Sequence, residues 1–439
     1  MIPIPTRRWL VGAALLSVVA PLALLRPWAA GLLPALDLLW VAALLTDWLG
    51  TARPRSLAVT REAPAAFGVG RGATVRYRWR HSERRPLTLE VREALPEPLG
   101  GAEMPTRRLR VPPGQGLDER LELVPVRRGA GSGGTLAVRA LGPLGLAWRQ
   151  DALTLPWSAT VYPTLPDTAL RALPLQVARR REAGLRAIRR PGEGRLFEGL
   201  REWVPGDETR VIDWKATARR GKPIARQYED ERRQQVLLVI DAGRLLTAEV
   251  NGASRLESVI TAALQLARAA VAHDDNIGLM VFADTIQRYH APGRGRRALK
   301  AVLDGLARVE GRLAESDYPA AFRHLAAHNR KRALTVLFTD VIDRTASDAL
   351  VAQAATLRPR HLPLAVTLPQ PSLEALASQR PDSTPEAFER AAAEALLGAR
   401  EAALAEMRAR GIVVVDVAPS AAGEAVVARY LQLKRRGLL

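Results

Sequence analysis

Two aspartates that directly follow apolar runs are the residues of this chain best placed to support binding chemistry. The run from Gln235 to Ile240 is typical of a buried strand and ends in Asp241, and the run from Leu334 to Thr339 ends in Asp340 in the same way. In a parallel sheet the carboxyl ends of the strands meet at one crevice, which is where ligands usually bind. We therefore expect the two carboxylates to lie close together in such a crevice.

A second group of candidate residues lies at 199–221, which reads GLREWVPGDETRVIDWKATARRG. Its Pro-Gly-Asp step predicts a turn. Charges of alternating sign surround two tryptophans, a pattern that favours a clamp of ion pairs and stacked rings and makes this segment a candidate interaction motif (Trp203, Gly206, Asp207, Arg210, Asp213, Trp214, Lys215 and Arg219). A catalytic carboxylate pair is the alternative, but the segment contains no histidine or nucleophile to serve with it.

Two weaker signals concern histidine and glycine. His324 and His328 are four residues apart on one predicted helix face, a spacing that can hold zinc, but no third ligand is close in sequence and a solvated or packed pair is favoured. The glycine-rich basic stretch at 293–297 lacks the Lys-Ser/Thr ending of a phosphate-binding loop. The chain has no cysteine, which excludes thiolate catalysis and cysteine–zinc sites.

The two aspartates require a scaffold of alternating strands and helices. Strands are predicted at 235–240, 277–282, 286–290, 334–340, 362–368 and 412–417, and helices at 254–273, 296–309, 319–328 and 385–410. Ser254 begins a capping box, and Thr384 is the predicted N-cap of the last helix because Pro385 follows it. This alternation predicts a doubly wound α/β domain at 235–439 with helices on both faces of a mostly parallel sheet.

The residues before this domain follow different patterns. Between 53 and 165, apolar residues alternate with polar ones in short runs at 73–79, 87–91, 108–111, 121–124 and 135–139, with Gly and Pro between the runs. Such regular short strands predict an all-β, sandwich-like module that serves as a spacer or docking module. Residues 166–234 are expected to form an arginine-rich connector followed by the candidate interaction motif.

Residues 1–52 contain two apolar segments, Trp9 to Leu25 and Ala29 to Leu49, the second interrupted by Asp37, Thr46 and Asp47. About 20 helical residues span a bilayer, so a hairpin of two transmembrane helices is predicted. Arginines flank the hairpin on its outer sides, which predicts that both termini and the soluble domains are cytoplasmic, at a bacterial inner membrane. Tryptophans are the expected contacts with the lipid interface (Trp9, Trp28 and Trp48).

The chain of 439 residues carries a formal charge of +19, which raises the question of nucleic acid. Only five of its 64 basic residues are lysine, and no stretch interleaves aromatic and basic residues as a stacking platform would. A basic face along an anionic inner-membrane lipid surface is the simpler use of this charge.

The string from Gly206 to Lys215, together with Val126-Arg-Arg-Gly129, Gly142-Pro-Leu-Gly-Leu146, Val161-Tyr-Pro163 and the paired apolar segments, resembles the bacterial family called domain of unknown function 58. This resemblance implies a membrane-tethered protein with a von Willebrand factor A-like domain. The family is often found beside MoxR-type AAA+ ATPases, and the resemblance implies no established catalytic activity.

The resemblance further implies a comparison with the Mg²⁺ site of von Willebrand A domains, which uses Asp-x-Ser-x-Ser, a threonine and a second aspartate. Asp241 and Asp340 match the aspartates, but Gly243 and Leu245 stand in place of the serines, and Ser316 or Asp317 would have to replace the threonine. A degenerate Mg²⁺ site of Asp241, Ser316, Asp317 and Asp340 is one interpretation. The favoured one is a crevice without metal that still serves as an interaction surface. Arg244, adjacent to the crevice, could neutralise the two aspartates in place of a cation.

From these features we expect a non-enzymatic adaptor that works with a MoxR-type AAA+ ATPase or its client proteins in the assembly or maturation of other proteins. The alternative is a basic cytoplasmic module that binds anionic lipid or nucleic acid directly.

Overall fold

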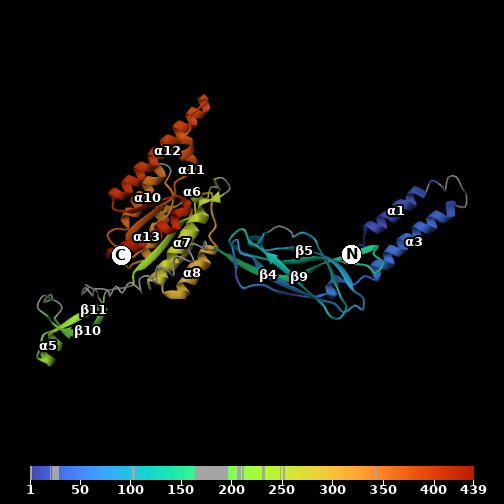
Figure 1. Cartoon of the computed structure of the whole chain (residues 1–439), viewed down its shortest axis with the longest axis horizontal. Coiled ribbons are helices and arrows are strands. Elements are labelled where there is room, and N and C mark those ends of the chain that lie inside the picture. Colours follow the sequence, from blue (N-terminus) through green and yellow to red (C-terminus); the bar gives the residue numbers. More distant parts are fainter. Residues whose placement is uncertain are drawn as a thin grey trace. The chain divides into compact units, whose positions relative to one another are not determined.

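The structure is a computed structural model that describes residues 2–19, 21, 29–100, 104–163, 196–204, 209, 212–229, 233–247, 249–250, 253–341 and 344–439. The predicted loop between the apolar segments and most of the arginine-rich connector lie outside these residues. Two compact units, Met1–Tyr162 and Pro163–Leu439, divide the chain, and each is described by itself. Figure 1 labels their elements.

Two helices begin the first unit, α1 (Arg7–Val19) and α3 (Ala29–Leu49). The segment Gly31–Ser56, which contains most of α3, has a mean hydropathy of 1.6 and is long and apolar enough to cross a membrane. The 13 residues of α1 extend only about 20 Å at 1.5 Å per residue. The described part of the chain thus has one N-terminal apolar helix of spanning length, a feature that membrane anchors and signal sequences share.

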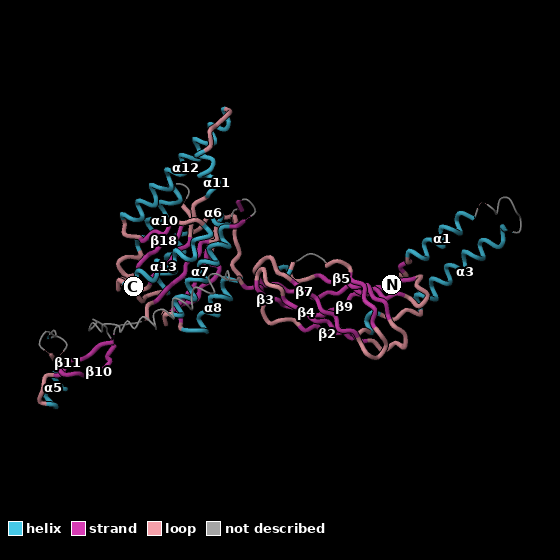
Figure 2. Tube along the Cα trace, viewed as in Figure 1, coloured by secondary structure: helices cyan, strands magenta, loops and turns pink. Residues whose placement is uncertain are grey.

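α1 and α3 lie side by side (Figure 2) and are joined by two tryptophans. The indole N–H of Trp9 donates to the backbone oxygen of Trp40 at 3.1 Å, and the indole N–H of Trp40 donates to the backbone oxygen of Trp9 at 3.2 Å. Gly12 permits this approach, because a Cβ there would lie 2.2 Å from the Trp40 ring. The two helices are therefore a specific pair.

The start of α1 is fastened to the β-rich part of the unit. Strand β1 (Ile4–Pro5) pairs with β9 (Ala147–Tyr162). Thr6 then donates its backbone N–H to the oxygen of Leu146 and its hydroxyl to the oxygen of Gly145, both at 2.8 Å. The helix thus starts from a fixed point on the sheet.

The end of α3 is fastened to the same turn through Asp47, whose side chain is almost fully buried. Its carboxylate accepts three backbone N–H groups at 2.6, 2.7 and 2.9 Å, those of Leu144, Leu146 and Ala147. A Cβ at Gly142 would lie 2.3 Å from this carboxylate, so the turn needs glycine there. Asp47, an interruption in an apolar run, therefore joins the helix pair to the sheets.

Two sheets form a β-sandwich-like module, as the alternating runs predicted. One has the order β1-β9-β8-β5-β6 with β3 beside β9, and the other has the order β2-β4-β7. Alternate residues of facing strands are buried in a common core, which includes Tyr77, Trp79, Leu89 and Val91. The remaining strands are β2 (Ala58–Glu62), β3 (Phe67–Gly68), β4 (Ala73–Arg80), β5 (Leu87–Ala94), β6 (Arg107–Val111), β7 (Leu117–Leu123) and β8 (Gly129–Leu141), with short 3₁₀ turns η1 (Pro54–Ser56) and η2 (Glu97–Leu99).

The longest strand, β9, was not predicted, because Pro156 interrupts its pattern and proline is normally confined to strand edges and bulges. The structure accommodates it at a bulge, where the β8–β9 register shifts between Gly133 and Thr135. Gly134 has a φ of +122°, and a Cβ there would lie 2.0 Å from the oxygen of Leu155. A glycine opposite the proline makes the long strand feasible.

The second unit contains a six-stranded, mostly parallel sheet of order β16-β15-β12-β17-β18-β19, in which only the edge strand β16 is antiparallel. Five of its strands are parallel because helical crossovers connect them. The mixed α/β sheet matches the predicted class. Its strands are β12 (Gln235–Asp241), β15 (Asn276–Phe282), β16 (Ile286–Gly293), β17 (Leu334–Phe338), β18 (Leu362–Thr367) and β19 (Val413–Asp416).

Helices cover both faces of this sheet (Figure 1). Val236, Leu238 and Ile240 of β12 pack with α7, α8 and α13, while Leu237 and Val239 pack with α9, α10 and α12. The alternation within one buried strand thus supplies both cores. The helices are α6 (Arg244–Thr247), α7 (Arg255–Ala272), α8 (Gly295–Ala307), α9 (Tyr318–His328), α10 (Arg344–Thr356), α11 (Pro371–Ser378), α12 (Thr384–Ala409) and α13 (Ala422–Arg435).

The helix caps are nearly as predicted. Ser254 is the N-cap of α7 and accepts the N–H of Leu256. The predicted cap at Thr384 is wrong by one residue: Ser383 is the N-cap of α12, and its side chain accepts the N–H of Glu386. Ser383 and Glu386 therefore have capping-box spacing, and Pro385 occupies the second helical position. The helices α10, α11 and α13 were not predicted.

Candidate functional site

The strand order of the α/β sheet reverses between the neighbouring strands β12 and β17. The chain leaves β12 toward β15 on one side of this pair and leaves β17 toward β18 on the other side. Asp241 is the last residue of β12, and Asp340 follows β17 after Thr339. Crevices form at such a reversal because the loops that follow the two strands diverge. Both aspartates are about 2% exposed, so they lie beneath this edge of the sheet.

Asp241 is surrounded by neutral donors. Its carboxylate accepts the N–H of Gly243 at 2.9 Å and the hydroxyls of Tyr318 and Thr339 at 2.7 and 2.9 Å, as well as the hydroxyl of Ser316. Burial and the neighbouring Asp241 raise the pKa of Tyr318 well above its usual range, so the phenol stays protonated as a donor. Four donors therefore satisfy this carboxylate without a cation.

Asp340 is neutralised by two buried arginines. Arg400 donates to one carboxylate oxygen at 2.6 Å, and Arg255 donates to the other. Arg255 and Arg400 are 6% and 7% exposed. The backbone N–H of Val341 also donates to Asp340 at 2.8 Å. Such charge-assisted hydrogen bonds offset the cost of removing charged groups from water when they are buried.

The same arginines extend the network to neighbouring elements. Arg400 also bonds Asp416 at the end of β19 and the oxygen of Val341. Arg255 donates to the oxygens of Leu245 and Leu368. Charged groups thus tie the carboxyl ends of the central and outer strands together.

The sequence reasoning missed Arg255 and Arg400, and it assigned their role to Arg244. That assignment is wrong, because Arg244 is exposed and pairs with Glu315 at 3.1 Å. A signal for Arg400 was available. It lies seven residues after Ala393, four before Leu404 and seven before Met407, so it shares one face of α12 with these buried residues. An arginine on an apolar helix face needs a buried partner.

The candidate metal ligands serve other contacts. Ser316 donates to Asp241, and Asp317 is the N-cap of α9, where its side chain accepts the N–H of Ala320 at 2.8 Å. A Cβ at Gly243 would lie 2.1 Å from the Ser316 hydroxyl oxygen. Ser316 therefore occupies the space in which a side chain at position 243 would reach toward Asp241.

These residues do not fit a Mg²⁺ ion. Magnesium needs octahedral oxygen ligands and keeps several waters, yet both carboxylates are already bonded and two guanidinium groups would repel a divalent cation at this distance. The hollow beside Asp340 and Arg400 has a volume of about 10 Å³, roughly that needed for one water. Within the described ranges, no group of three His, Asp or Glu side chains could hold a metal.

The described part of the candidate interaction motif lies within the second unit, between two paired strands. β10 (Leu196–Glu202) pairs antiparallel with β11 (Ile224–Glu229), and α5 (Trp214–Arg220) lies between them in sequence. Asp213 is the N-cap of α5 and accepts the N–H of Ala216 at 3.0 Å. Gly221, in the left-handed region, ends the helix. Asp213 therefore has a structural role in starting the helix.

The motif leaves one tryptophan in solvent. Trp214 is 70% exposed, and Leu200 and Val204 are also exposed large apolar residues of this segment. Lys215 and Arg219 lie on exposed positions of the same helix. Trp203 is half-buried, while Gly206, Asp207 and Arg210 lie outside the described residues.

The remaining candidate residues have packing roles. His324 and His328 stack at 4.0 Å between ring centroids and both contact Tyr289. Burial and the neighbouring His328 lower the pKa of His324. The guanidinium of Arg149 lies over the Trp48 ring, 5.0 Å from the ring centroid. Trp28 lies outside the described part of the chain.

Comparison with known proteins finds one family and a number of distant structures, two of which are described here. No curated protein matches the chain. The CARDB domain of a Pyrococcus furiosus protein, solved with di-metal ions, is 12% identical, with a TM-score of 0.18 over 24% of this chain and 86% of that one. The PKD domain of an M14-like peptidase from a Thermoplasmatales archaeon is also 12% identical, with a TM-score of 0.15 over 23% and 93%. Neither likeness is close enough to carry an argument.

The family model described as "Protein of unknown function DUF58" matches residues 199–381. This range begins in β10, includes the motif with Trp214, and contains both crevice aspartates and Arg255. The chain therefore contains a DUF58 family domain at residues 199–381.

Proposed function

We propose that this chain is a membrane-anchored, non-enzymatic adaptor that binds a MoxR-type AAA+ ATPase or its client proteins through its DUF58 domain. In this proposal α1 and α3 form a transmembrane hairpin at a bacterial inner membrane, and both soluble parts are cytoplasmic. The Trp9–Trp40 contacts and the attachment of both helices to one turn support an anchor that is retained with the folded module.

The α/β domain is, in this proposal, a von Willebrand factor A-like domain that has exchanged its metal for arginine. Counting strands within the domain, the order 3-2-1-4-5-6 with an antiparallel third strand supports it. The Asp340 ion pairs with Arg255 and Arg400 supply the positive charge that a cation would supply at the same strand ends. Such a crevice can keep the shape of the loops without a divalent ion.

The exposure of Trp214 is the observation that carries the adaptor proposal. A side chain of this size forgoes much of the favourable free energy of burial when it is 70% exposed, so its exposure points to a partner surface. Tryptophan is also enriched among the residues that dominate binding energy at protein interfaces. Leu200 and Val204 of the same segment add apolar surface, and Lys215 and Arg219 supply charges suited to a polar rim.

Binding of a purified MoxR-type ATPase to the full chain in mild detergent tests this proposal. Replacing Trp214 with Ser is expected to weaken the affinity by at least about tenfold, because truncation of a central aromatic contact typically costs about 2 kcal/mol or more. Phe388 is the matched control, since it is an aromatic residue of α12 with 72% exposure. Its replacement by Ser should leave the affinity unchanged.

Equal affinity of wild type and the Trp214→Ser variant, or an equal loss in both variants, would contradict the assignment of the binding surface. If the wild-type chain does not bind the ATPase at all, the proposed partner is wrong.

A further inference from the structure

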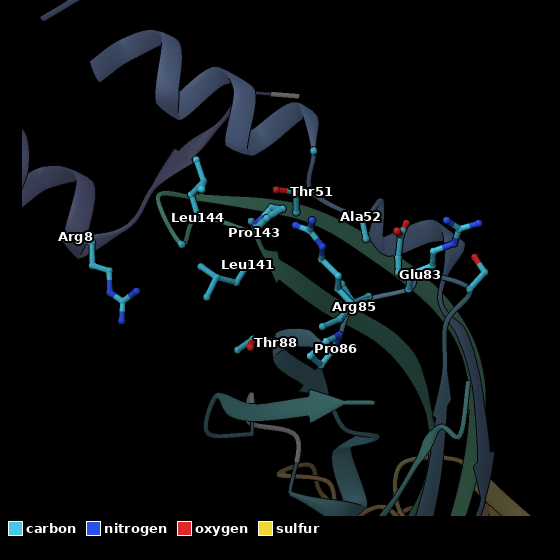
Figure 3. Close-up of a pocket in the computed structure, with 16 residues that line it drawn as sticks. Arg8, Thr51, Ala52, Glu83, Arg85, Pro86, Thr88, Leu141, Pro143 and Leu144 are labelled. Atoms are coloured by element: carbon cyan, nitrogen blue, oxygen red, sulfur yellow. The ribbon is translucent and has the colours of Figure 1, made fainter. Parts of the chain in front are cut away.

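A basic groove lies in the first unit, at the turn that holds both helix ends. It has a volume of about 740 Å³ and is lined by residues of four regions: Arg8 of α1, residues 50–52 after α3, residues 82–88 and residues 141–145. Figure 3 shows Arg8 and Arg85 reaching into this region from opposite sides, with Leu141 and Pro143 between them.

Three arginines dominate the charge of the groove. Arg8, Arg84 and Arg85 are exposed, and none of them forms an ion pair with any residue that the structure describes. Glu83 is the one acidic residue among the lining residues. Ser82 and Thr88 add hydroxyl groups. This combination of guanidinium and hydroxyl donors suits a phosphate group.

The backbone makes room for one of these arginines. Gly145 has a φ of +73°, and a Cβ at this position would lie 3.2 Å from an Nη atom of Arg8. A side chain at position 145 would therefore press on the guanidinium. The turn that binds Asp47 thus also leaves space for Arg8 at the mouth of the groove.

The position of the groove selects the source of the phosphate. Arg8 lies in the first turn of α1, and Gly50, Thr51 and Ala52 follow the end of α3. If these helices span a bilayer, as proposed above, their fastened ends lie at the level of the lipid headgroups. The lining contains no aromatic residue, so the groove offers no surface on which a nucleobase could stack.

We propose that this groove binds the headgroup of an anionic phospholipid, with Arg8, Arg84 and Arg85 on the phosphate and Ser82 and Thr88 as further donors. The inference rests on the proposed membrane placement of α1 and α3, but it is independent of the partner assigned to Trp214. A bound headgroup would lie against the same turn that fastens both helices.

Titration of the full chain with phosphatidylglycerol in micelles of uncharged detergent, read out by native mass spectrometry, tests the proposal. The paired replacement Arg84→Gln/Arg85→Gln is expected to raise the dissociation constant by at least about tenfold, because two charge-assisted contacts are lost. The Arg84→Lys/Arg85→Lys pair should recover most of the affinity, since lysine keeps the charge but not the planar fork.

The matched control is Arg120→Gln/Arg127→Gln, which removes the same charge from exposed positions of the same unit outside the groove. It should change the dissociation constant by less than about twofold if binding is local rather than a general response to net charge. Circular dichroism spectra of all variants should coincide with that of the wild type.

Equal affinity for phosphatidylglycerol and phosphatidylcholine would overturn the proposal, as would equal losses in the groove and control variants. Displacement of the lipid by an excess of inorganic phosphate would assign the groove to free phosphate instead. Vesicle flotation separates headgroup binding from membrane anchoring. A chain that floats with vesicles but shows no headgroup preference would refute the groove proposal and leave the anchor proposal standing. Binding of the ATPase by the Arg84→Gln/Arg85→Gln variant separates the groove from the adaptor function.

Discussion

At the scale of single residues, the α/β crevice is a place where charges are compensated internally. Asp340 is shared by Arg255 and Arg400, and the donors to Asp241 among the described residues are neutral. Breaking a buried ion pair from one side leaves an uncompensated charge, which is much more costly than replacing the whole pair. Each member of this network should therefore be sensitive to substitution.

Replacing Arg400 with Ala is expected to destabilise the α/β domain by about 3–5 kcal/mol, because Asp340 and Asp416 lose a partner. Arg410 lies in the segment that ends the same helix and forms an exposed pair with Glu406 four residues earlier, so its replacement should cost at most about 0.5 kcal/mol. Hydrogen exchange of β12 and β17 amides in the full chain measures the loss of stability in the Arg400 and Arg410 variants. Similar exchange in the two variants would show that the buried network contributes little.

His361, which directly precedes β18, provides a pH-dependent prediction. Burial and the neighbouring Arg360 lower its pKa below the usual 6.5. A lowered folded-state pKa means that the unfolded chain binds the proton more readily, so stability is fully present above pH 6.5 and is lost as the pH falls through the folded-state value.

Hydrogen exchange of β18 amides, corrected for its intrinsic pH dependence, should therefore show weaker protection at pH 5 than at pH 7, and a His361→Gln variant should show a smaller difference. An unchanged pH response in that variant would exclude His361 as its source. His290, on the edge strand β16, is the control position.

At the scale of elements, the sequence was sufficient where one pattern decides the outcome. The buried runs of β12 and β17 and their terminal aspartates follow from consecutive apolar residues, and α7 follows from its cap at Ser254. α10 and α13 were missed, although the buried residues Ala422, Val426, Tyr430 and Leu433 of α13 recur at helical spacing. The contacts of Arg255 and Arg400 could not be predicted, because they join residues 85 and 60 positions away from Asp340.

The join between α3 and the β-rich module gives a prediction at this scale. Replacing Asp47 with Ala leaves three backbone N–H groups of the 142–147 turn without their acceptor, and each unsatisfied group costs about 1–3 kcal/mol when it stays buried. The amides of Leu144, Leu146 and Ala147 should therefore exchange faster with solvent.

Thr46 is the control for this change, because it neighbours Asp47 but is exposed and its hydroxyl bonds only within the helix. The Thr46→Ala variant should retain wild-type exchange in the turn. If the Asp47→Ala variant also retains it, the carboxylate does not hold the helix end to the sheet.

At the scale of the whole molecule, the features of each unit are consistent with a tethered binding protein. The first unit joins an apolar helix pair to a β-sandwich-like module through one turn. The second contains a DUF58 domain with an exposed tryptophan and a crevice whose charges are already paired. The central proposal is that this is a von Willebrand factor A-like crevice in which arginine takes the place of a metal ion.

Thermal unfolding of the full chain in Mg²⁺ and in a chelator, at matched ionic strength, tests this claim most directly. A ligand that binds only the folded state raises stability by RT ln(1 + [L]/Kd), so the unfolding temperature of the α/β domain would rise with Mg²⁺ if the crevice held the ion. We predict no change between Mg²⁺ and chelator. A rise that depends on Mg²⁺ concentration and disappears in an Asp241→Asn variant would contradict the account.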